Sequence, residues 1–270
     1  MRFMAYKDGD GVAIGRVVGE TVETLCDLNT FYDDPFVALQ ATPVSGSARP
    51  IADVVQVPPV PTTAQILCVG LNYAAHIEET ASQRPEAPNI FGRWYRTLQC
   101  QDAEVSVPPG EPGLDWEGEL AVIIGSELVD VSEEAAMEGV LGYTCFNDIT
   151  ARTHQRRTPQ WTLGKNAKGS GPIGPVVVSA DEFGDPQQKH LETRYNGAVV
   201  QSTSTERMLF KVAETISYAS RCLTLYPGDV LATGTPSGVG SRMDPPVLMT
   251  AGDRIEVEIE DIGTLRTRIV

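Results

Sequence analysis

Most of the chain consists of short apolar runs separated by turn residues, and few of these runs have helical spacing. Residues 2–6 and 12–18 are two such runs, and the glycine-rich segment 9–11 between them is typical of a hairpin turn. Residues 255–260 alternate strictly between apolar and charged side chains, which indicates a half-exposed strand, and residues 265–270 are predicted to pair with it. The pattern predicts a β-rich α+β protein whose body is a mixed or antiparallel β-roll.

Two segments have a helical pattern. Residues 132–139 are predicted to form a short helix, with Ser132 as its N-cap and acidic residues in its first turn. A second helix is predicted from about residue 205 to residue 222. Its apolar positions recur at helical spacing, namely Leu209, Val212, Ile216 and Ala219.

A proline-dense segment at residues 57–63 divides the chain. Proline has no backbone N–H and a fixed φ, so this segment cannot lie inside a central strand or a helix. We therefore predict a small N-terminal α/β domain with its linker over residues 1–60, and a main β-roll domain over residues 61–270.

Composition narrows the classes of function. The 270 residues include 36 acidic and 21 basic side chains, a formal net charge of -15. This charge argues against nucleic-acid binding, and it would repel an anionic substrate unless a metal or local cations reversed the field. No apolar run reaches about 18 residues and the N-terminus has no apolar signal region, so we expect a cytoplasmic protein without a membrane span. The five widely spaced cysteines lack a C-x-x-C pair, which fits a reduced protein without a zinc cage.

Three carboxylates are the strongest candidates for a functional site. Glu117 and Glu119 lie in the apolar run 116–125, and Asp148 ends the apolar run 142–148. Alternate residues of a strand share a face, so the two glutamates point the same way. Like charges on one face of a buried strand repel, and a divalent cation that prefers oxygen ligands removes the repulsion. By spacing alone, an edge strand with both glutamates in water is an equal alternative.

Among the three histidines, His76 has the most suggestive surroundings. It follows a strand-like run that ends at Gly70, and Glu79 lies three residues later, on the same face of a helical turn. Such a pair could act as a general base with an orienting carboxylate, although this spacing is common in proteins. His154 has no obvious partner, and His190 lies in a polar stretch typical of the surface.

Two further segments offer polar groups. Lys165 follows a run of arginines, and it is either a solvated surface lysine or a cation that stabilises an enolate oxygen. The glycine-rich segment 234–240 lacks the Lys-Ser/Thr pair of a phosphate loop, which argues against nucleotide binding. Its backbone N–H groups and the Thr235 hydroxyl could hold a substrate carboxylate, or the segment is only a tight turn.

Six segments together resemble the fumarylacetoacetate hydrolase superfamily, in the branch of acylpyruvate hydrolases and 2-hydroxyhepta-2,4-diene-1,7-dioate isomerases. In chain order they read CVGLNYAAHIEE, WEGELAVIIG, GYTCFNDITAR, QWTLGK, YNGAVVQ and PGDVLATGTPSGVG. They cover nearly all of residues 65–270 in the family's order, and the combination is far more specific than any one segment. The N-terminal domain matches only loosely.

The resemblance implies a mixed β-roll that usually pairs as a homodimer, with Mg²⁺ or Mn²⁺ at its mouth and Ca²⁺ as a candidate in crystals. It also implies roles for nine residues: Glu117, Glu119 and Asp148 as metal ligands, His76 and Glu79 as the dyad that activates water, Lys165 as the lysine beside the metal, and Arg93, Gln155 and Thr235 as substrate contacts. After Lys165 the chain departs from the family pattern, which leaves the shape of the substrate open.

We therefore expect a divalent-metal-dependent hydrolase that cleaves a carbon–carbon bond in a small 2-oxo acid of the acylpyruvate or fumarylacetoacetate type. His76, oriented by Glu79, would take a proton from the attacking water, and the metal and Lys165 would stabilise the departing enolate. The alternatives are a decarboxylase of oxaloacetate type or an isomerase of 2-hydroxyhepta-2,4-diene-1,7-dioate-type diacids, since the fold does not choose among them. A binding protein without catalytic activity is a further alternative. Residues 77–89 are polar and contain prolines, and we predict that they form a lid over the substrate.

Overall fold

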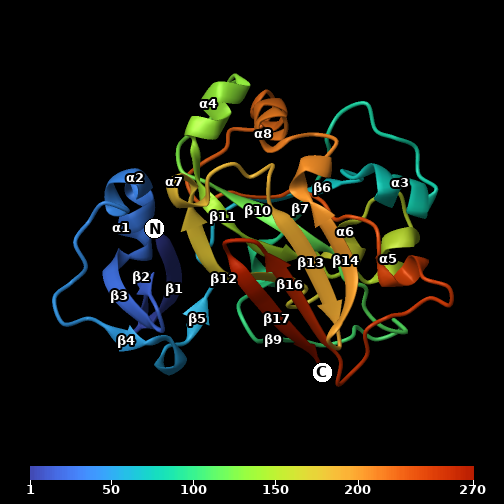
Figure 1. Ribbon diagram of the computed structural model, residues 1–270, viewed down its shortest axis with the longest axis horizontal. Helices are drawn as coiled ribbons and strands as arrows, with labels where there is room; N and C mark the ends of the chain where they lie inside the picture. Colours follow the sequence, from blue (N-terminus) through green and yellow to red (C-terminus); the bar gives the residue numbers. More distant parts are fainter.

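Two β-sheets form the body of the protein, whose computed structural model describes residues 1–270 (Figure 1). The main path of the larger, 12-stranded sheet runs in the order β4 (Arg49–Pro50), β3 (Thr21–Asp27), β2 (Gly11–Val18), β1 (Arg2–Asp8), β12 (Gly171–Ser179), β11 (Val140–Asn147), β10 (Gly118–Ile124), β15 (Val230–Ala232), β6 (Ile66–Gly70) and β7 (Asn89–Arg93). Two short strands complete it, β5 (Gln56–Val57) beside β1 and β8 (Leu98–Gln99) beside β12. The five-stranded sheet runs in the order β14 (Ala198–Ser204), β13 (His190–Tyr195), β16 (Arg254–Ile259), β17 (Gly263–Ile269) and β9 (Ala103–Val105).

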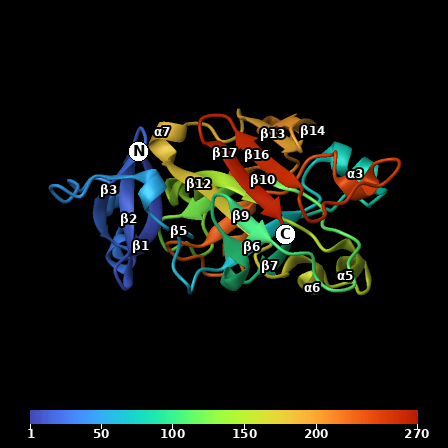
Figure 2. The same cartoon turned by 90° about the horizontal axis from the view of Figure 1, so that it is seen from below.

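The helices are short and lie around these sheets (Figures 1 and 2). The α-helices are α1 (Leu28–Asp33), α2 (Pro35–Ala38), α3 (Ala74–Thr80), α4 (Glu133–Glu138), α5 (Arg152–Arg156), α6 (Thr162–Lys165), α7 (Ala180–Phe183) and α8 (Val212–Ser220). Single turns of 3-10 helix are η1 (Ile51–Asp53), η2 (Tyr95–Thr97), η3 (Thr205–Arg207) and η4 (Gly240–Arg242). None of the helices is both long and apolar enough to cross a membrane.

Strand β10 lies at the centre of the core because both of its faces are covered. Leu120 and Val122 face the five-stranded sheet and pack in one cluster with Val257 of β16. The intervening Ala121 points to the opposite face, where it shares a second cluster with Phe3 of β1. A strand buried on both faces reads as a continuous apolar run, which is the pattern of residues 120–124.

The N-terminal strands extend the main sheet. Strand β1 pairs with β12, and Phe3 lies opposite Val177. Phe3 and Ile14 belong to the same buried cluster as Ile123 of β10, so this core is common to the N-terminal strands and the body. Figures 1 and 2 show the N-terminal strands at one end of the molecule. The division at residue 60 stays a prediction.

The β-rich architecture with few helices agrees with the expectation from the sequence. The hairpin of β1 and β2 turns at Gly9, whose φ is +58°, and β16 pairs with β17 as predicted. Ser132 caps α4 by accepting a hydrogen bond from the Ala135 N–H. Each of these local predictions is confirmed.

The predicted start of the long helix near residue 205 is wrong, because α8 begins only at Val212. The preceding residues are held by Asn72, which follows β6. Its backbone oxygen accepts from Leu209 N–H at 2.8 Å, and its Oδ1 accepts from Phe210 N–H at 2.8 Å. These bonds to Asn72 use the backbone N–H groups of Leu209 and Phe210, so the two residues lie outside the helix.

Candidate active site

The three carboxylates meet because of the register of two neighbouring strands. Gly118 of β10 lies opposite Asn147 of β11, so Glu117 faces Asp148, whose backbone N–H donates to the Glu117 oxygen at 2.9 Å. Glu119 lies two residues along β10 on the same face. All three acids are buried, and one oxygen of each lies within 4.8 Å of the others. The convergence predicted from the sequence is therefore present, and the alternative of two solvated glutamates is wrong.

Two of the three acids are paired with buried cations. Lys165 Nζ lies 2.7 Å from Glu117 Oε2 and 2.5 Å from Asp148 Oδ2. Arg152 Nη2 lies 2.7 Å from Glu117 Oε1, and Arg93 forms an ion pair with Asp148. Burial would raise the pKa of Glu117, but the charges of Lys165 and Arg152 outweigh it and lower that pKa to about 2. Glu117 is thus ionised.

Glu119 differs from the other two acids because no lysine, arginine or histidine nitrogen lies within 4.0 Å of it. Its Oε2 accepts one hydrogen bond, from Gly234 N–H at 2.8 Å. Burial, and then the charges of Asp148 and Glu117, raise its pKa well above the ordinary value. A buried carboxylate in this position needs either a proton or a further cation.

The donor set fits a hard divalent cation. Glu117, Glu119 and Asp148 offer only carboxylate oxygens, and neither cysteine nor histidine is among the clustered donors. Mg²⁺ and Mn²⁺ prefer oxygen ligands, whereas zinc sites usually contain cysteine or histidine. A dication between these acids would also supply the charge that Glu119 lacks. These three residues would therefore hold the metal.

The histidine dyad lies on α3, directly after β6. His76 is buried, and its Nδ1 lies 3.1 Å from Glu79 Oε2. The other oxygen of Glu79 accepts from Gly238 N–H at 2.8 Å, so each carboxylate oxygen has a hydrogen-bond partner and the orientation of the carboxylate is fixed. Because an ionised carboxylate only accepts hydrogen bonds, Glu79 favours the tautomer with the proton on Nδ1, which leaves Nε2 as the nitrogen that can accept a proton. That arrangement suits a general base.

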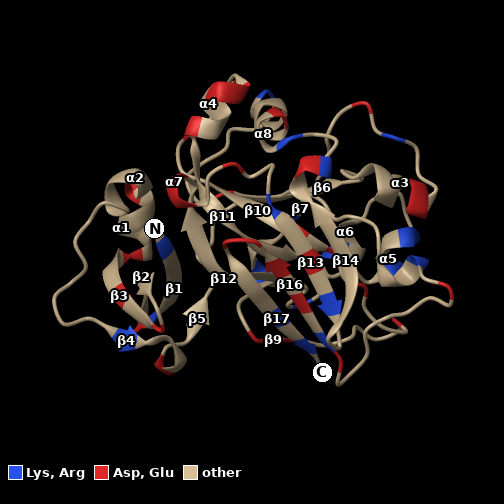
Figure 3. Cartoon of the chain, in the orientation of Figure 1, with Lys and Arg blue, Asp and Glu red and all other residues tan.

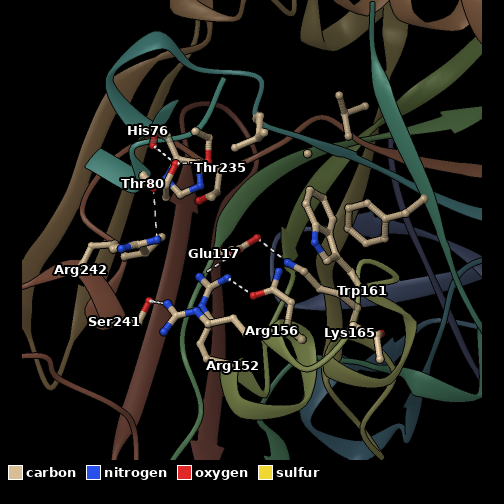
Figure 4. A pocket seen from close by; sticks show the side chains of 18 residues that line it. His76, Thr80, Glu117, Arg152, Arg156, Trp161, Lys165, Thr235, Ser241 and Arg242 are labelled. Carbon is tan, nitrogen blue, oxygen red and sulfur yellow. Dashed lines mark hydrogen bonds and ion pairs between the residues drawn. The ribbon is translucent and has the colours of Figure 1, made fainter. Parts of the chain in front are cut away.

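A cavity of about 280 Å³ opens beside the carboxylates (Figure 4). Five of the nine predicted site residues line it: His76, Glu117, Gln155, Lys165 and Thr235. Trp161 and Phe91 form an aromatic wall, with ring centroids 5.4 Å apart in an edge-to-face arrangement. In Figure 4, Glu117 lies between Trp161 on one side and Arg242 on the other.

Arg93 and Thr235 differ from the expected substrate contacts. The Arg93 side chain is fully buried between Asp148 and Ser170 and does not line the cavity, so its contacts hold Asp148 of the three-acid centre in place of the expected contact with a substrate. The Thr235 hydroxyl donates to Gly118 O at 3.1 Å and accepts from Gln201 Nε2 at 2.8 Å. The Thr235 hydroxyl is therefore engaged within the protein, whereas its backbone N–H has no partner.

Two residues that support the site, Asp115 and Gln201, were not singled out from the sequence. Asp115 accepts from Arg152 Nε at 2.7 Å and from Gly240 N–H at 2.7 Å, which ties α5 to the loop after β15. Gln201 accepts from Gly118 N–H at 3.0 Å and donates to Thr235. Asp115 could have been predicted from its position just before the run that contains Glu117 and Glu119. Gln201 could not, because it comes from the other sheet and no nearby motif marks it.

The remaining histidines lie outside the cavity lining. His154 was expected to lack a partner, but it is paired with Glu111, a residue 43 positions earlier in the chain. His190 is exposed, as predicted.

A family model for the C-terminal part of fumarylacetoacetate (FAA) hydrolase matches residues 65–270. The fold and the carboxylate centre define a metal-dependent enzyme, and the chain belongs to the fumarylacetoacetate hydrolase family. It is 36% identical over 262 residues to the mitochondrial oxaloacetate tautomerase Fahd2a of Rattus norvegicus, covering 90% of this chain and 83% of the relative.

Two solved structures are similar over the whole chain. The 2-hydroxyhepta-2,4-diene-1,7-dioate isomerase from Mycobacterium marinum has a TM-score of 0.83 and 33% identity, covering 100% of this chain and 98% of the other. The maleylpyruvate hydrolase from Sphingobium sp. SYK-6, in complex with manganese(II) and pyruvate, has a TM-score of 0.78 and 26% identity, covering 100% and 99%. The relatives therefore include a tautomerase, an isomerase and a hydrolase.

Proposed function

We propose that this enzyme interconverts the keto and enol forms of a small 2-oxo acid by moving a proton at the carbon beside the oxo group, with Mg²⁺ or Mn²⁺ as cofactor. One observation carries the proposal. His76, which is bonded to Glu79, and Lys165 line the same cavity as Glu117, one acid of a buried centre in which Glu119 has no cationic partner. A proton carrier is thus next to a place where negative charge on a substrate oxygen would be stabilised.

The roles of the residues follow from their contacts. A bound divalent cation supplies Lewis-acid polarisation of the oxo group. In the keto-to-enol direction His76 Nε2 takes the proton from carbon 3 and gives it to the oxygen on carbon 2, and in the reverse direction it moves the proton back, while the Nδ1–H bond to Glu79 stabilises the transient imidazolium. Burial lowers the pKa of Lys165, but Asp148 and Glu117 outweigh this effect and raise it, so Lys165 remains an ammonium group that stabilises a developing oxyanion.

Carbon–carbon bond hydrolysis, the expectation from the sequence, is the second candidate. In that reaction His76 takes the proton from water, the hydroxide adds to the distal carbonyl, and the bond that breaks releases the enolate of a 2-oxo acid. The similar maleylpyruvate hydrolase, whose structure contains manganese(II) and pyruvate, favours this candidate. Decarboxylation of an oxaloacetate-type acid needs no attacking water and so would depend less on His76.

A substrate panel tests the proposal. The purified protein is incubated with Mg²⁺ and enol-oxaloacetate, and the loss of enol absorbance is followed; acylpyruvates and oxaloacetate report hydrolysis and decarboxylation in parallel. We expect Mg²⁺-dependent acceleration of the enol–keto exchange that EDTA abolishes and that His76→Gln removes. His190→Gln, an exposed histidine, is the matched control. Acceleration that survives both EDTA and His76→Gln would overturn the proposal.

Two expectations from the sequence analysis stay proposals. Pairing as a homodimer is one of them, and it is measurable by light scattering. Localisation in the cytoplasm is the other, and the name of the rat relative places that protein in mitochondria.

A further inference from the structure

Two guanidinium groups at the mouth of the cavity have no acidic partner. Arg156 at the end of α5 and Arg242 at the end of η4 line the cavity and are exposed. Arg156 Nη2 donates to Ser241 Oγ at 3.2 Å, and Arg242 Nη2 donates to the Thr80 backbone oxygen at 3.2 Å. No carboxylate oxygen lies within 4.0 Å of either guanidinium. Both groups therefore bind only neutral oxygens.

Arg156 and Arg242 lie near a third arginine, Arg152, so positive charge is concentrated on this side of the cavity. Arg152 is matched by Asp115 and Glu117, but burial and then the charges of Arg152 and Arg242 lower the pKa of Arg156. The chain carries 36 acidic side chains against 21 basic ones, so acids are abundant elsewhere on its surface (Figure 3). A cluster of like charges beside a cavity is unfavourable until an anion neutralises it.

We propose that Arg156, Arg242 and Ser241 form a subsite for the second carboxylate of a dianionic 2-oxo acid. This inference rests on the proposed function, in which Glu117, Glu119 and Asp148 would hold a divalent cation that would bind the first carboxylate and the oxo group. The planar fork of a guanidinium matches the two oxygens of a carboxylate, and the Ser241 hydroxyl adds a third donor. The enzyme then prefers 2-oxo diacids to monoacids of similar size.

The other cations of the cavity cannot fill this role. The Arg152 guanidinium is engaged with Asp115, Glu117 and Gln155, and Lys165 is engaged with Glu117 and Asp148. Ser241 and Arg242 lie on the side of the cavity opposite Trp161 and Lys165 (Figure 4). A substrate anchored beside Lys165 therefore extends toward the free arginines with its distal end.

Kinetics with a matched pair of substrates test the subsite. Oxaloacetate carries the distal carboxylate, and its 4-methyl ester has the same skeleton without that charge. We expect Arg156→Gln and Arg242→Gln each to raise KM for oxaloacetate about 10-fold or more, because charge-assisted hydrogen bonds are lost, and to leave KM for the ester unchanged. Arg156→Lys should restore part of the effect.

Arg157→Gln is the matched control, since Arg157 is exposed and next in the chain but does not line the cavity. It removes the same charge and should change neither KM. Equal changes in KM for both substrates, or no change with oxaloacetate in the double variant, would overturn the subsite.

Binding separates failure of the subsite from failure of the proposed function. If the wild-type protein turns over neither substrate, the proposed function fails, and calorimetry in Mn²⁺ decides the subsite alone. The subsite requires oxaloacetate to bind about 10-fold or more tightly than its ester, with the preference lost in the double variant. Equal affinities in the wild-type protein would refute it.

Discussion

The floor and the mouth of the cavity hold cations in opposite states. The floor consists of Lys165, Arg152 and the three-acid centre behind them, and these two cations are buried and lie against carboxylates. At the mouth, Arg156 and Arg242 are exposed and bind only neutral oxygens. The unmatched charge on the floor is the acid Glu119, whereas the unmatched charges at the mouth are basic. The floor is thus suited to receive a cation and the mouth to receive an anion.

The two regions also differ in how firmly the fold positions them. Removing one partner from a buried charged pair leaves the other charge uncompensated, which is costly, so the geometry of the floor is tightly constrained. Exposed arginines are solvated, and each can turn toward a ligand at little cost. Substitutions on the floor should therefore change the chemistry, and substitutions at the mouth should change the choice of substrate.

The largest effect is expected from Glu119→Gln, which should lower Mg²⁺-dependent turnover by at least about 10³-fold. The amide keeps an acceptor for Gly234 N–H but cannot neutralise a dication. Without metal the variant should unfold at the same or a higher temperature, because repulsion from Asp148 and Glu117 is relieved. Thermal unfolding with and without Mg²⁺ measures this, and the stabilisation by Mg²⁺ should vanish. Glu134→Gln, on the exposed face of α4, is the control.

His76→Gln should come next, with a loss of about 10²–10⁴-fold in proton transfer or hydrolysis. The reason is the loss of the free Nε2 lone pair beside the cavity. Decarboxylation of oxaloacetate should be spared. Assays of all three reactions on one preparation check this, and equal losses in all three would mean that His76 serves another purpose.

Lys165→Met should reduce kcat by about 10²–10³-fold, since one positive group near the developing oxyanion is removed. The same change frees oxygens of Glu117 and Asp148, so Mn²⁺ should bind more tightly than in the wild-type protein. Steady-state kinetics and a Mn²⁺ titration measure the two effects. Weaker Mn²⁺ binding together with an unchanged kcat would show that the lysine is only structural.

The smallest effect is expected from Gly164→Ala, which probes how the floor is packed. A Cβ atom there would lie 2.6 Å from the Cα and N atoms of Gln155, so α5 and α6 would have to move apart. We expect a loss of about 1–3 kcal/mol in the free energy of unfolding, measured by urea denaturation. Gly92→Ala, where a Cβ meets nothing within 4 Å, should cost less.

The sequence predicted the acids of the floor because strand alternation is a local property. Glu117 and Glu119 share a face whatever their partners are, and the apolar runs around them indicate burial. The pairing of Glu117 with Asp148 depends on the register of β10 and β11, which no local pattern specifies. The residues singled out Asp148 as the acid that ends a second apolar run, and the resemblance to the family agreed on the same three acids.

Long-range contacts explain the expectations that failed. Arg93 lies at the end of β7, and only its position behind Asp148 in the folded sheet shows that it is buried. The start of α8 shifted because Asn72 binds a segment 138 residues away. The mouth was missed as well, since Arg242 lies 86 positions after Arg156 and the two meet only across the cavity.

The most direct test of the three-acid centre is anomalous diffraction from crystals grown with Mn²⁺. We predict a single strong peak bonded, at a distance on the order of 2 Å, to one oxygen each of Glu117, Glu119 and Asp148. A peak bonded elsewhere, or none at these acids under saturating Mn²⁺, would contradict the account.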